Sequence, residues 1–332
     1  MTDAAVFLTA ALVALLLGKP VIGWLAGIRA QQTIYAYAPE THRTKEGTPT
    51  MGGVLIMLGG GSGILTWGAL TRELLVPMLV IFSGAVWFAL IGLVDDYWIR
   101  RWTGQRGLEW KQKLALQLLA GVVSVSMLWL MASGAGETTA LLGLSPPQQA
   151  QLPLNPATFT LGLIWLIGWV NAFNLTDGLD GLAAGLTALA MMGTYAIGAS
   201  QGNTNAYALV VAGACVGYLW WNVYPARVFM GDTGSMFLGA SFGLLTLHHL
   251  IRAPDLKNWG AFALVGLVFA VEILSVVVQL SSVKLRRGRR IFRATPIHHH
   301  FELLGWAEPT IVMRFWLVGA ITAAGGVALS QW

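Results

Sequence analysis

The sequence predicts an all-α integral membrane protein with about ten transmembrane helices. Of its 332 residues, 56% are hydrophobic and only 11% are charged, whereas soluble domains carry about a quarter charged residues. A membrane-spanning helix needs roughly 20 mostly apolar residues, and the chain contains ten stretches of this kind. The Lys and Arg residues also fall mainly in alternate loops, as they do in multispan proteins.

The ten expected spans leave no room for a large soluble domain, so we expect one polytopic domain over residues 1–332. We expect the first span to be retained, because Asp3 stands where a signal peptide would carry positive charge. The single cysteine, Cys215, falls within the seventh span, where it is expected to pack as an apolar residue. The spans are residues 5–27, 51–70, 75–94, 114–133, 158–175, 179–198, 205–221, 234–251, 259–281 and 311–330.

Basic residues in the short loops predict the orientation of the bundle. If the first helix runs inwards, the inner loops hold fifteen Lys and Arg residues and the outer loops hold three, Arg72, Arg252 and Lys257. Both termini are therefore predicted to lie outside the cytoplasm. The chain has a net charge of +5. Because its basic residues fall mainly in the predicted inner loops, this charge does not indicate nucleic-acid binding. The inner run "KLRRGRRIFR" (284–293) either attracts anionic lipid headgroups or serves only as a topology signal.

Polar motifs gather at the predicted cytoplasmic ends of different spans. Carboxylates crowded on one face repel one another unless cations are near. Oxygen ligands without cysteine favour a hard cation, and Mg²⁺ is typically held by one or two carboxylates together with substrate phosphates. A glycine-rich helix start such as "GDTGS" suits phosphate. The motifs are "HRTKEGTPTMGG" (42–53), "LVDDYW" (93–98), "NLTDGLDG" (174–181), "VFMGDTGS" (228–235) and "TPIHHHFELLGW" (295–306).

A polar residue stands at every third position where the fifth and sixth spans meet: Asn171, Asn174, Asp177 and Asp180. Each step of three turns an α-helix by about 300°, so the whole set cannot share one face of a straight helix. The nearby glycines of "TDGLDG" predict a break in the helix, which would let all four side chains face one cavity. Such non-helical backbone is tolerated at membrane depth only where it lines protein or water. We therefore expect one wall of a polar cleft open to the cytoplasm.

Taken together, five motifs resemble the phospho-N-acetylmuramoyl-pentapeptide-transferase family over nearly the whole chain. They are "KEGTPTMGG" (45–53), "DDY" (95–97), "NAFNLTDGLDGLA" (171–183), "PARVFMGDTGS" (225–235) and "PIHHHFELLGW" (296–306). "DDY" alone indicates the wider superfamily of polyprenyl-phosphate sugar-1-phosphate transferases. The resemblance implies transfer of phospho-N-acetylmuramoyl-pentapeptide from its UDP conjugate to undecaprenyl phosphate. The products would be lipid I and UMP, and the enzyme would be an Mg²⁺-dependent homodimer of the bacterial inner membrane.

The resemblance also implies roles for individual residues. Asp232 would be the leading Mg²⁺ ligand and Asp95 a second, and Phe229 would stack on uracil. The implied catalytic residues are Asp95, Asp96, Lys113, Asp232, His298 and His299. The implied substrate-binding residues are Lys45, Thr50, Asn174, Asp177, Asp180, Asn222, Phe229 and His300, with Asn171 supporting them from behind.

Two features leave the mechanism open. Ile99 stands where family members often carry Lys, and Arg100 or Arg101 could take over that charge. Asp95 could act as a base or as a covalent nucleophile, but the lipid phosphate loses its second proton at about pH 6, so we expect positioning around Mg²⁺ to contribute more. Glu272, within the ninth span, makes either an interhelical hydrogen bond or a functional contact.

Three other functions compete with this interpretation. A sister transferase would move N-acetylglucosamine-1-phosphate to the same lipid, and the "PIHHHFE" motif argues against it. A cation-coupled transporter would need ionisable residues on both sides of the membrane, whereas the acidic residues here crowd one side. A zinc protease would need a pattern such as "HExxH", which the sequence lacks.

Overall fold

The described part of the chain is a bundle of helices. The structure, a computed structural model, describes residues 1–28, 45, 47–71, 76–99, 107–132, 151–201 and 206–332. The helices are α1 (Thr2–Leu16), α2 (Gly18–Gly27), α3 (Gly53–Thr71), α4 (Val76–Leu93), the π-helix η2 (Val94–Ile99), α6 (Trp110–Ala132), α8 (Pro156–Thr176), α9 (Leu182–Ser200), α10 (Tyr207–Asn222), α11 (Gly231–Arg252), α12 (Leu256–Val265), α13 (Leu267–Leu285), α14 (Ile297–Glu302) and α15 (Glu308–Ser330).

The predicted membrane character is confirmed by the length and composition of these helices. Within the described residues, eight helices are each long and apolar enough to cross a membrane, and α1 with α2 forms a ninth candidate bent by 42°. The shorter apolar helix α10 coincides with the seventh expected span. Every one of the ten expected spans therefore corresponds to helix.

Two of the expected spans are not continuous. The first bends at Leu17, where Pro20 in the first turn of α2 has no N–H to donate to the turn before it. A β-carbon at Gly18 would also overlap the indole of Trp221, which packs into this bend. The ninth is divided at Gly266 into α12 and α13, and the ring of Trp169 packs against that glycine.

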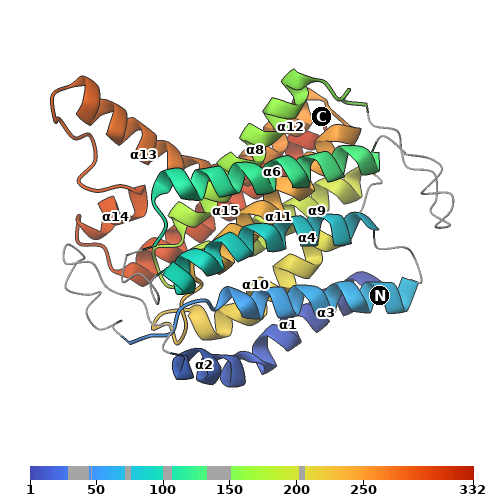
Figure 1. The fold of residues 1–332 in the computed structure, drawn as a ribbon, viewed down its shortest axis with the longest axis horizontal. Coiled ribbons are helices and arrows are strands. Elements are labelled where there is room, and N and C mark those ends of the chain that lie inside the picture. Colours follow the sequence, from blue (N-terminus) through green and yellow to red (C-terminus); the bar gives the residue numbers. More distant parts are fainter. Residues whose placement is uncertain (29–44, 46, 72–75, 100–106, 133–150, 202–205) are drawn as a thin grey trace.

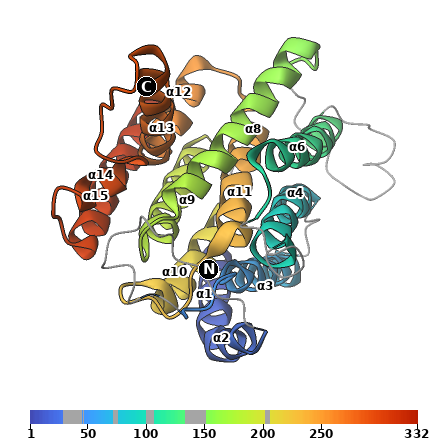
Figure 2. The same cartoon turned by 60° about the vertical axis from the view of Figure 1, so that its left-hand side comes forward.

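Helix α11 lies at the centre of the bundle. It contacts α3, α4, α6, α8 and α9, and Figure 2 shows it surrounded by these neighbours. Every residue from Thr233 to Ile251 is buried, as expected of a helix enclosed by protein on all sides. The position of Asp232, in its first turn, is therefore fixed by the packing of the whole bundle.

Glycines allow three backbones to meet where α11 begins. Gly53 of α3 lies against the backbone of Gly234, and Gly92 of α4 lies against the backbone of Asp232 and Thr233. Small residues of this kind let helices approach closely where no larger side chain fits. The first turn of α11 is thereby held directly against α3 and α4.

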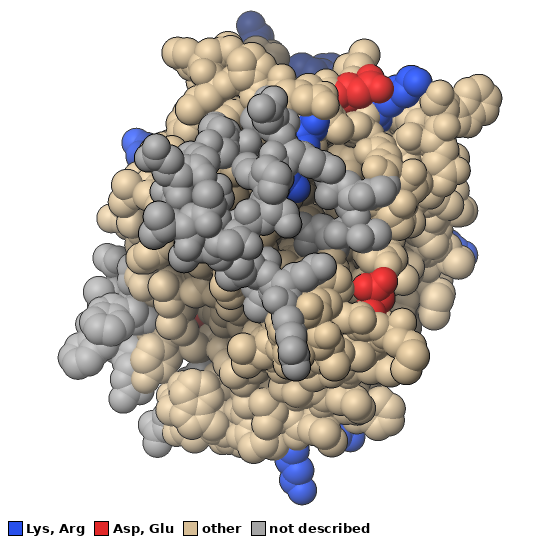
Figure 3. Space-filling model, turned by 90° about the vertical axis from the view of Figure 1, so that its right-hand side faces the viewer, with Lys and Arg blue, Asp and Glu red and all other residues tan. Residues whose placement is uncertain are grey.

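The functional motifs and the chain termini lie at different ends of the bundle. Figure 1 shows α14 and the beginning of α15 at one end, while the N- and C-termini lie toward the other. Figure 3 looks onto the terminal end, where charged side chains are sparse among the described residues. The histidine motif of α14 thus lies away from the chain termini.

Replacing Gly53 by Val should destabilise the bundle, because the new side chain would overlap the backbone of Gly234 rather than a side chain that can turn away. Overpacking of this kind costs about 1–3 kcal/mol. Thermal unfolding of the detergent-purified protein measures the effect. The matched control is Gly168→Val in α8, where a β-carbon has open space around it. Equal melting temperatures for the two variants would contradict the close approach of α3 and α11.

Candidate active site

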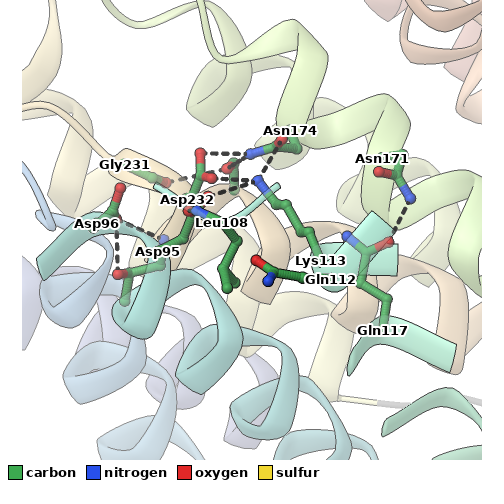
Figure 4. Close-up of polar contacts among 12 residues, drawn as sticks. Asp95, Asp96, Leu108, Gln112, Lys113, Gln117, Asn171, Asn174, Gly231 and Asp232 are labelled. Carbon is green, nitrogen blue, oxygen red and sulfur yellow. Dashed lines mark hydrogen bonds and ion pairs between the residues drawn. The ribbon is translucent and has the colours of Figure 1, made fainter. Parts of the chain in front are cut away.

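Four helices bring their polar side chains together around the ammonium group of Lys113. Its Nζ donates to Asp232 Oδ2, lies 3.2 Å from Asp95 Oδ2 and lies 3.4 Å from Asn174 Oδ1. Figure 4 shows these side chains converging from α6, η2, α8 and α11. One cation therefore partly neutralises two carboxylates that would otherwise repel each other. We call this group of four residues the Lys113 centre.

The π-helical turn positions Asp95 within the Lys113 centre. A π-helix is wider than an α-helix, and such turns often occur at functional sites. Asp95 Oδ1 accepts a hydrogen bond of 2.5 Å from the backbone N–H of Leu108. Gly107 precedes that residue with a φ of +122° and lies against the same carboxylate. Both oxygens of Asp95 are thus engaged, one by backbone and one by Lys113.

Asp232 is the more exposed carboxylate of the centre, with its side chain 29% exposed against 13% for Asp95. Its Oδ1 accepts a hydrogen bond of 2.9 Å from Asn174 Nδ2, which also donates to Ser235 Oγ at 2.9 Å. These contacts orient Asp232 while leaving part of its surface open. Of the two carboxylates of the centre, it is the better placed to meet a ligand.

Asp96 lies beside the centre but serves the start of α11. Its Oδ2 accepts hydrogen bonds from the backbone N–H of Thr233 at 3.0 Å and from the hydroxyl of Thr233 at 2.9 Å. A carboxylate at a helix N-terminus satisfies unpaired N–H groups and is favoured by the helix dipole. The structure therefore gives Asp96, 7% exposed, a role in holding α11 against η2. Thr50, 2% exposed, packs nearby beside Gly231.

The predicted break between the fifth and sixth spans is confirmed. Helix α8 ends at Thr176, α9 begins at Leu182, and Gly181 between them has a φ of +80°. Burial, together with the negative charges of Asp232, Asp96 and Asp180, raises the pKa of the Asp177 carboxyl well above its ordinary value. Asp177 is the C-cap residue of α8, so the turn holds it apart from the regular face of the helix.

The expectation that all four polar residues of this stretch face one cavity is wrong for Asn171. Its Nδ2 donates to Gln117 Oε1 and to the backbone carbonyl of Ile167, both at 2.9 Å. Figure 4 shows Asn171 and Gln117 apart from the carboxylates. Asn171 lies about one helical turn before Asn174 on α8, so its side chain meets α6 about one turn away from the Lys113 centre.

A second polar group forms around Lys45, next to the same turn. Lys45 Nζ lies 2.7 Å from both Asp180 Oδ1 and Glu308 Oε1, and 5.9 Å from the centre of the Phe229 ring. Asn222 accepts from the backbone N–H of Gly181 at 3.1 Å and donates to the Val228 carbonyl at 2.9 Å. The predicted nucleotide-side residues Lys45, Asp180, Asn222 and Phe229 are thus brought together.

The three consecutive histidines have three different surroundings. His298 is completely buried, with Nδ1 3.1 Å from Glu272 Oε2 and Nε2 against Gly178, although neither ring nitrogen has an aligned hydrogen-bond partner among the described residues. His299 is partly exposed, and its Nδ1 lies 2.5 Å from Glu302 Oε2. His300 Nδ1 accepts from the backbone N–H of Arg293 at 3.1 Å. Glu272 therefore has a partner in the histidine motif.

Two of the residues that complete these groups carry no clear signal in the sequence. Glu308 and Gln117 were not singled out, because nothing local distinguishes them from other polar residues at or within a span. The only available signal for Glu308 is an acidic residue directly before the last apolar run. The question raised by Ile99 stays a prediction, because its side chain and residues Arg100 and Arg101 lie outside the described residues.

Similarity to known proteins identifies the class of protein to which the chain belongs. The family model described as Glycosyl transferase family 4 matches residues 78–249, more than half of the chain. The helical bundle and its polar end are therefore those of a membrane-embedded transferase of this class. A shorter model, described as Phospho-N-acetylmuramoyl-pentapeptide-transferase signature 1, matches residues 45–57.

Curated relatives narrow the class to one family. The phospho-N-acetylmuramoyl-pentapeptide-transferase of Moorella thermoacetica is 40% identical, over 96% of this chain and 96% of the relative. Those of Thermodesulfovibrio yellowstonii and Maricaulis maris are 37% and 38% identical, over 93% and 97% of this chain and 87% and 90% of the relatives. The chain belongs to the phospho-N-acetylmuramoyl-pentapeptide-transferase family.

Replacing Asp177 by Asn should stabilise the protein at neutral pH. An aspartate whose pKa is raised by folding destabilises the fold once ionised, so the cost is absent below the unfolded pKa of about 3.9 and complete above the folded pKa. The melting temperature of the variant should therefore exceed that of the wild type increasingly from pH 4 to pH 8. Asp255→Asn, at an exposed helix start, is the control. A variant less stable than the wild type at pH 7 would contradict the repulsion inferred here.

Proposed function

We propose that this chain transfers phospho-N-acetylmuramoyl-pentapeptide from its UDP conjugate to undecaprenyl phosphate, giving lipid I and UMP. The observation that carries the proposal is the Lys113 centre, which the family's own motifs build at one end of an apolar bundle. One substrate is a soluble diphosphate and the other is a phosphate on a membrane-embedded tail. Such a pair needs positive charge and oriented polar groups at the membrane surface.

Mg²⁺ is part of the proposal. The oxygens that surround the Lys113 ammonium, from Asp232, Asp95 and Asn174, are of the type that Mg²⁺ prefers. Asp232 would be the leading ligand and Asp95 a second, and the bound ion would supply further positive charge to the diphosphate. Substrate phosphates would complete the coordination. No cluster of three or more His, Cys, Asp or Glu side chains arranged for a metal occurs in the described part of the chain.

The protein's contribution to the reaction is electrostatic positioning. An oxygen of the lipid phosphate attacks the sugar-linked phosphorus, and the bond from that phosphorus to the oxygen of UMP breaks. Lys113 stabilises the negative charge spread over the phosphoryl oxygens. Both oxygens of Asp95 are already engaged, by Leu108 N–H and Lys113, which favours a one-step transfer over attack by Asp95 itself.

The remaining predicted residues divide between the two halves of the nucleotide substrate. Lys45, Asp180, Asn222 and Phe229 would hold the uridine, with the Phe229 ring stacked on uracil. His299, 32% exposed, would reach the phosphates or the sugar. His298 would support the site without touching the substrate, because it is buried between Glu272 and the turn at Gly178. Thr50, Asp177 and His300 complete the predicted substrate-binding set together with Asn174 of the Lys113 centre.

The proposed location is the bacterial inner membrane, with this end of the bundle facing the cytoplasm. In the sequence, the basic residues of the predicted inner loops flank the same motifs, and UDP-linked substrate is cytoplasmic. Both termini would then face outwards. We also include, from the resemblance, a homodimer in which each copy is one polytopic domain; its mass in detergent, measured by light scattering, tests that part.

The first experiment measures UMP release by the detergent-purified protein given UDP-N-acetylmuramoyl-pentapeptide, undecaprenyl phosphate and Mg²⁺. Release should require the lipid, and Asp232→Ala should lower it by at least about 10²-fold, the usual effect of removing one preorganised charge contact. Asp255→Ala is the matched control, since it too removes an aspartate at the start of a helix, far from the site. Turnover of UDP-N-acetylglucosamine instead would assign the sister transferase function.

A further inference from the structure

One oxygen of Glu308 connects three segments of the polar group around Lys45. It opens α15, and its side chain is 9% exposed. Glu308 Oε1 accepts hydrogen bonds from Lys45 Nζ and from the backbone N–H of Asp180, each at 2.7 Å. Lys45 precedes the second span and Asp180 lies between the fifth and sixth, so the contact connects parts of the chain that are far apart in sequence.

The position of Lys45 depends on two carboxylates. Burial by itself would lower the pKa of Lys45, but the attraction of Glu308 and Asp180 outweighs it and raises the pKa. The side chain therefore stays charged, and two partners on different elements fix its place more closely than one partner could. Loss of Glu308 would leave the ammonium with Asp180 alone and would leave the Asp180 N–H without this acceptor.

Asp180 connects Lys45 to the segment that carries the Phe229 ring. Its Oδ1 pairs with Lys45, and its Oδ2 accepts from the backbone N–H of Ala226 at 2.9 Å. Ala226 is three residues before Phe229, whose ring lies 5.9 Å from Lys45 Nζ. Glu308 is thus hydrogen-bonded to Lys45 and is connected, through Asp180, to the segment that leads to Phe229.

We propose that Glu308 is a positioning residue for the uridine half of the nucleotide substrate, acting through Lys45 and the backbone of Asp180. The identity of the ligand rests on the proposed function. Because Glu308 lies apart from the Lys113 centre in its contacts, its loss should weaken nucleotide binding and leave the lipid substrate unaffected.

Calorimetric titration with UMP and steady-state kinetics test the proposal. Glu308→Leu should weaken UMP affinity about tenfold, the usual effect of losing a hydrogen bond to a charged group. The KM for the UDP substrate should rise similarly, while kcat and the KM for undecaprenyl phosphate stay within about twofold. Glu308→Gln keeps the shape but not the charge, so it should give a smaller loss and serves if the Leu variant does not fold. Glu109→Leu, at an exposed acid ahead of α6, is the control.

A double-mutant cycle separates positioning from a general loss of structure. If Glu308 acts in part through Lys45, the loss of UMP affinity caused by Glu308→Leu should be clearly smaller in the Lys45→Met background than in the wild type. Additive losses, a fall confined to kcat, or an unchanged UMP affinity in Glu308→Leu and Glu308→Gln would overturn the proposal. A wild-type protein that releases UMP in the assay but tolerates both variants would refute this inference alone. A wild-type protein that neither binds nor releases UMP would refute the proposed function, and this inference with it.

Discussion

The ammonium group of Lys113 is the charge on which the rest of the site depends. Without a cation between them, the carboxylates of Asp95 and Asp232 would repel each other at the start of α11. Lys113 comes from α6, whereas the carboxylates come from η2 and α11, so this contact also joins three helices. The end of the bundle that carries the motifs is therefore held together by the same contact that forms the candidate site.

The packing of the buried helix α11 links this local contact to the rest of the bundle. Its first turn carries Asp232, the backbone N–H and the hydroxyl of Thr233 donate to Asp96, and glycines of α3 and α4 pack directly against it. In lipid, helices gain little from apolar contact alone, so close backbone approach and polar contacts between helices matter more. The N-terminus of α11 contains both, which explains why glycine and acidic motifs occur there together.

The sequence predicted what local patterns encode. Long apolar runs defined the spans, and the glycines of "TDGLDG" predicted the break after α8. The interruption at Gly266 was not predicted, because one glycine among 40 carries no distinguishing signal until Trp169 is seen against it. The pairings of Lys45 with Glu308 and of His298 with Glu272 depend on how distant helices pack. Periodicity also could not orient Asn171, because its partner depends on how α6 packs against α8.

The contact between Lys45 and Glu308 spans 263 residues, and this has a consequence for biosynthesis. Membrane helices are made and inserted in order along the chain, from the first to the last. The Lys113 centre has all its residues once α11 has been made, but the nucleotide side lacks Glu308 until the last helix begins to emerge from the ribosome. A nascent or prematurely terminated chain would thus carry a nearly complete set of charged groups without the residue that aligns Lys45. If Glu308 positions Lys45 as proposed, the chain would become able to bind its nucleotide substrate only when translation is almost finished.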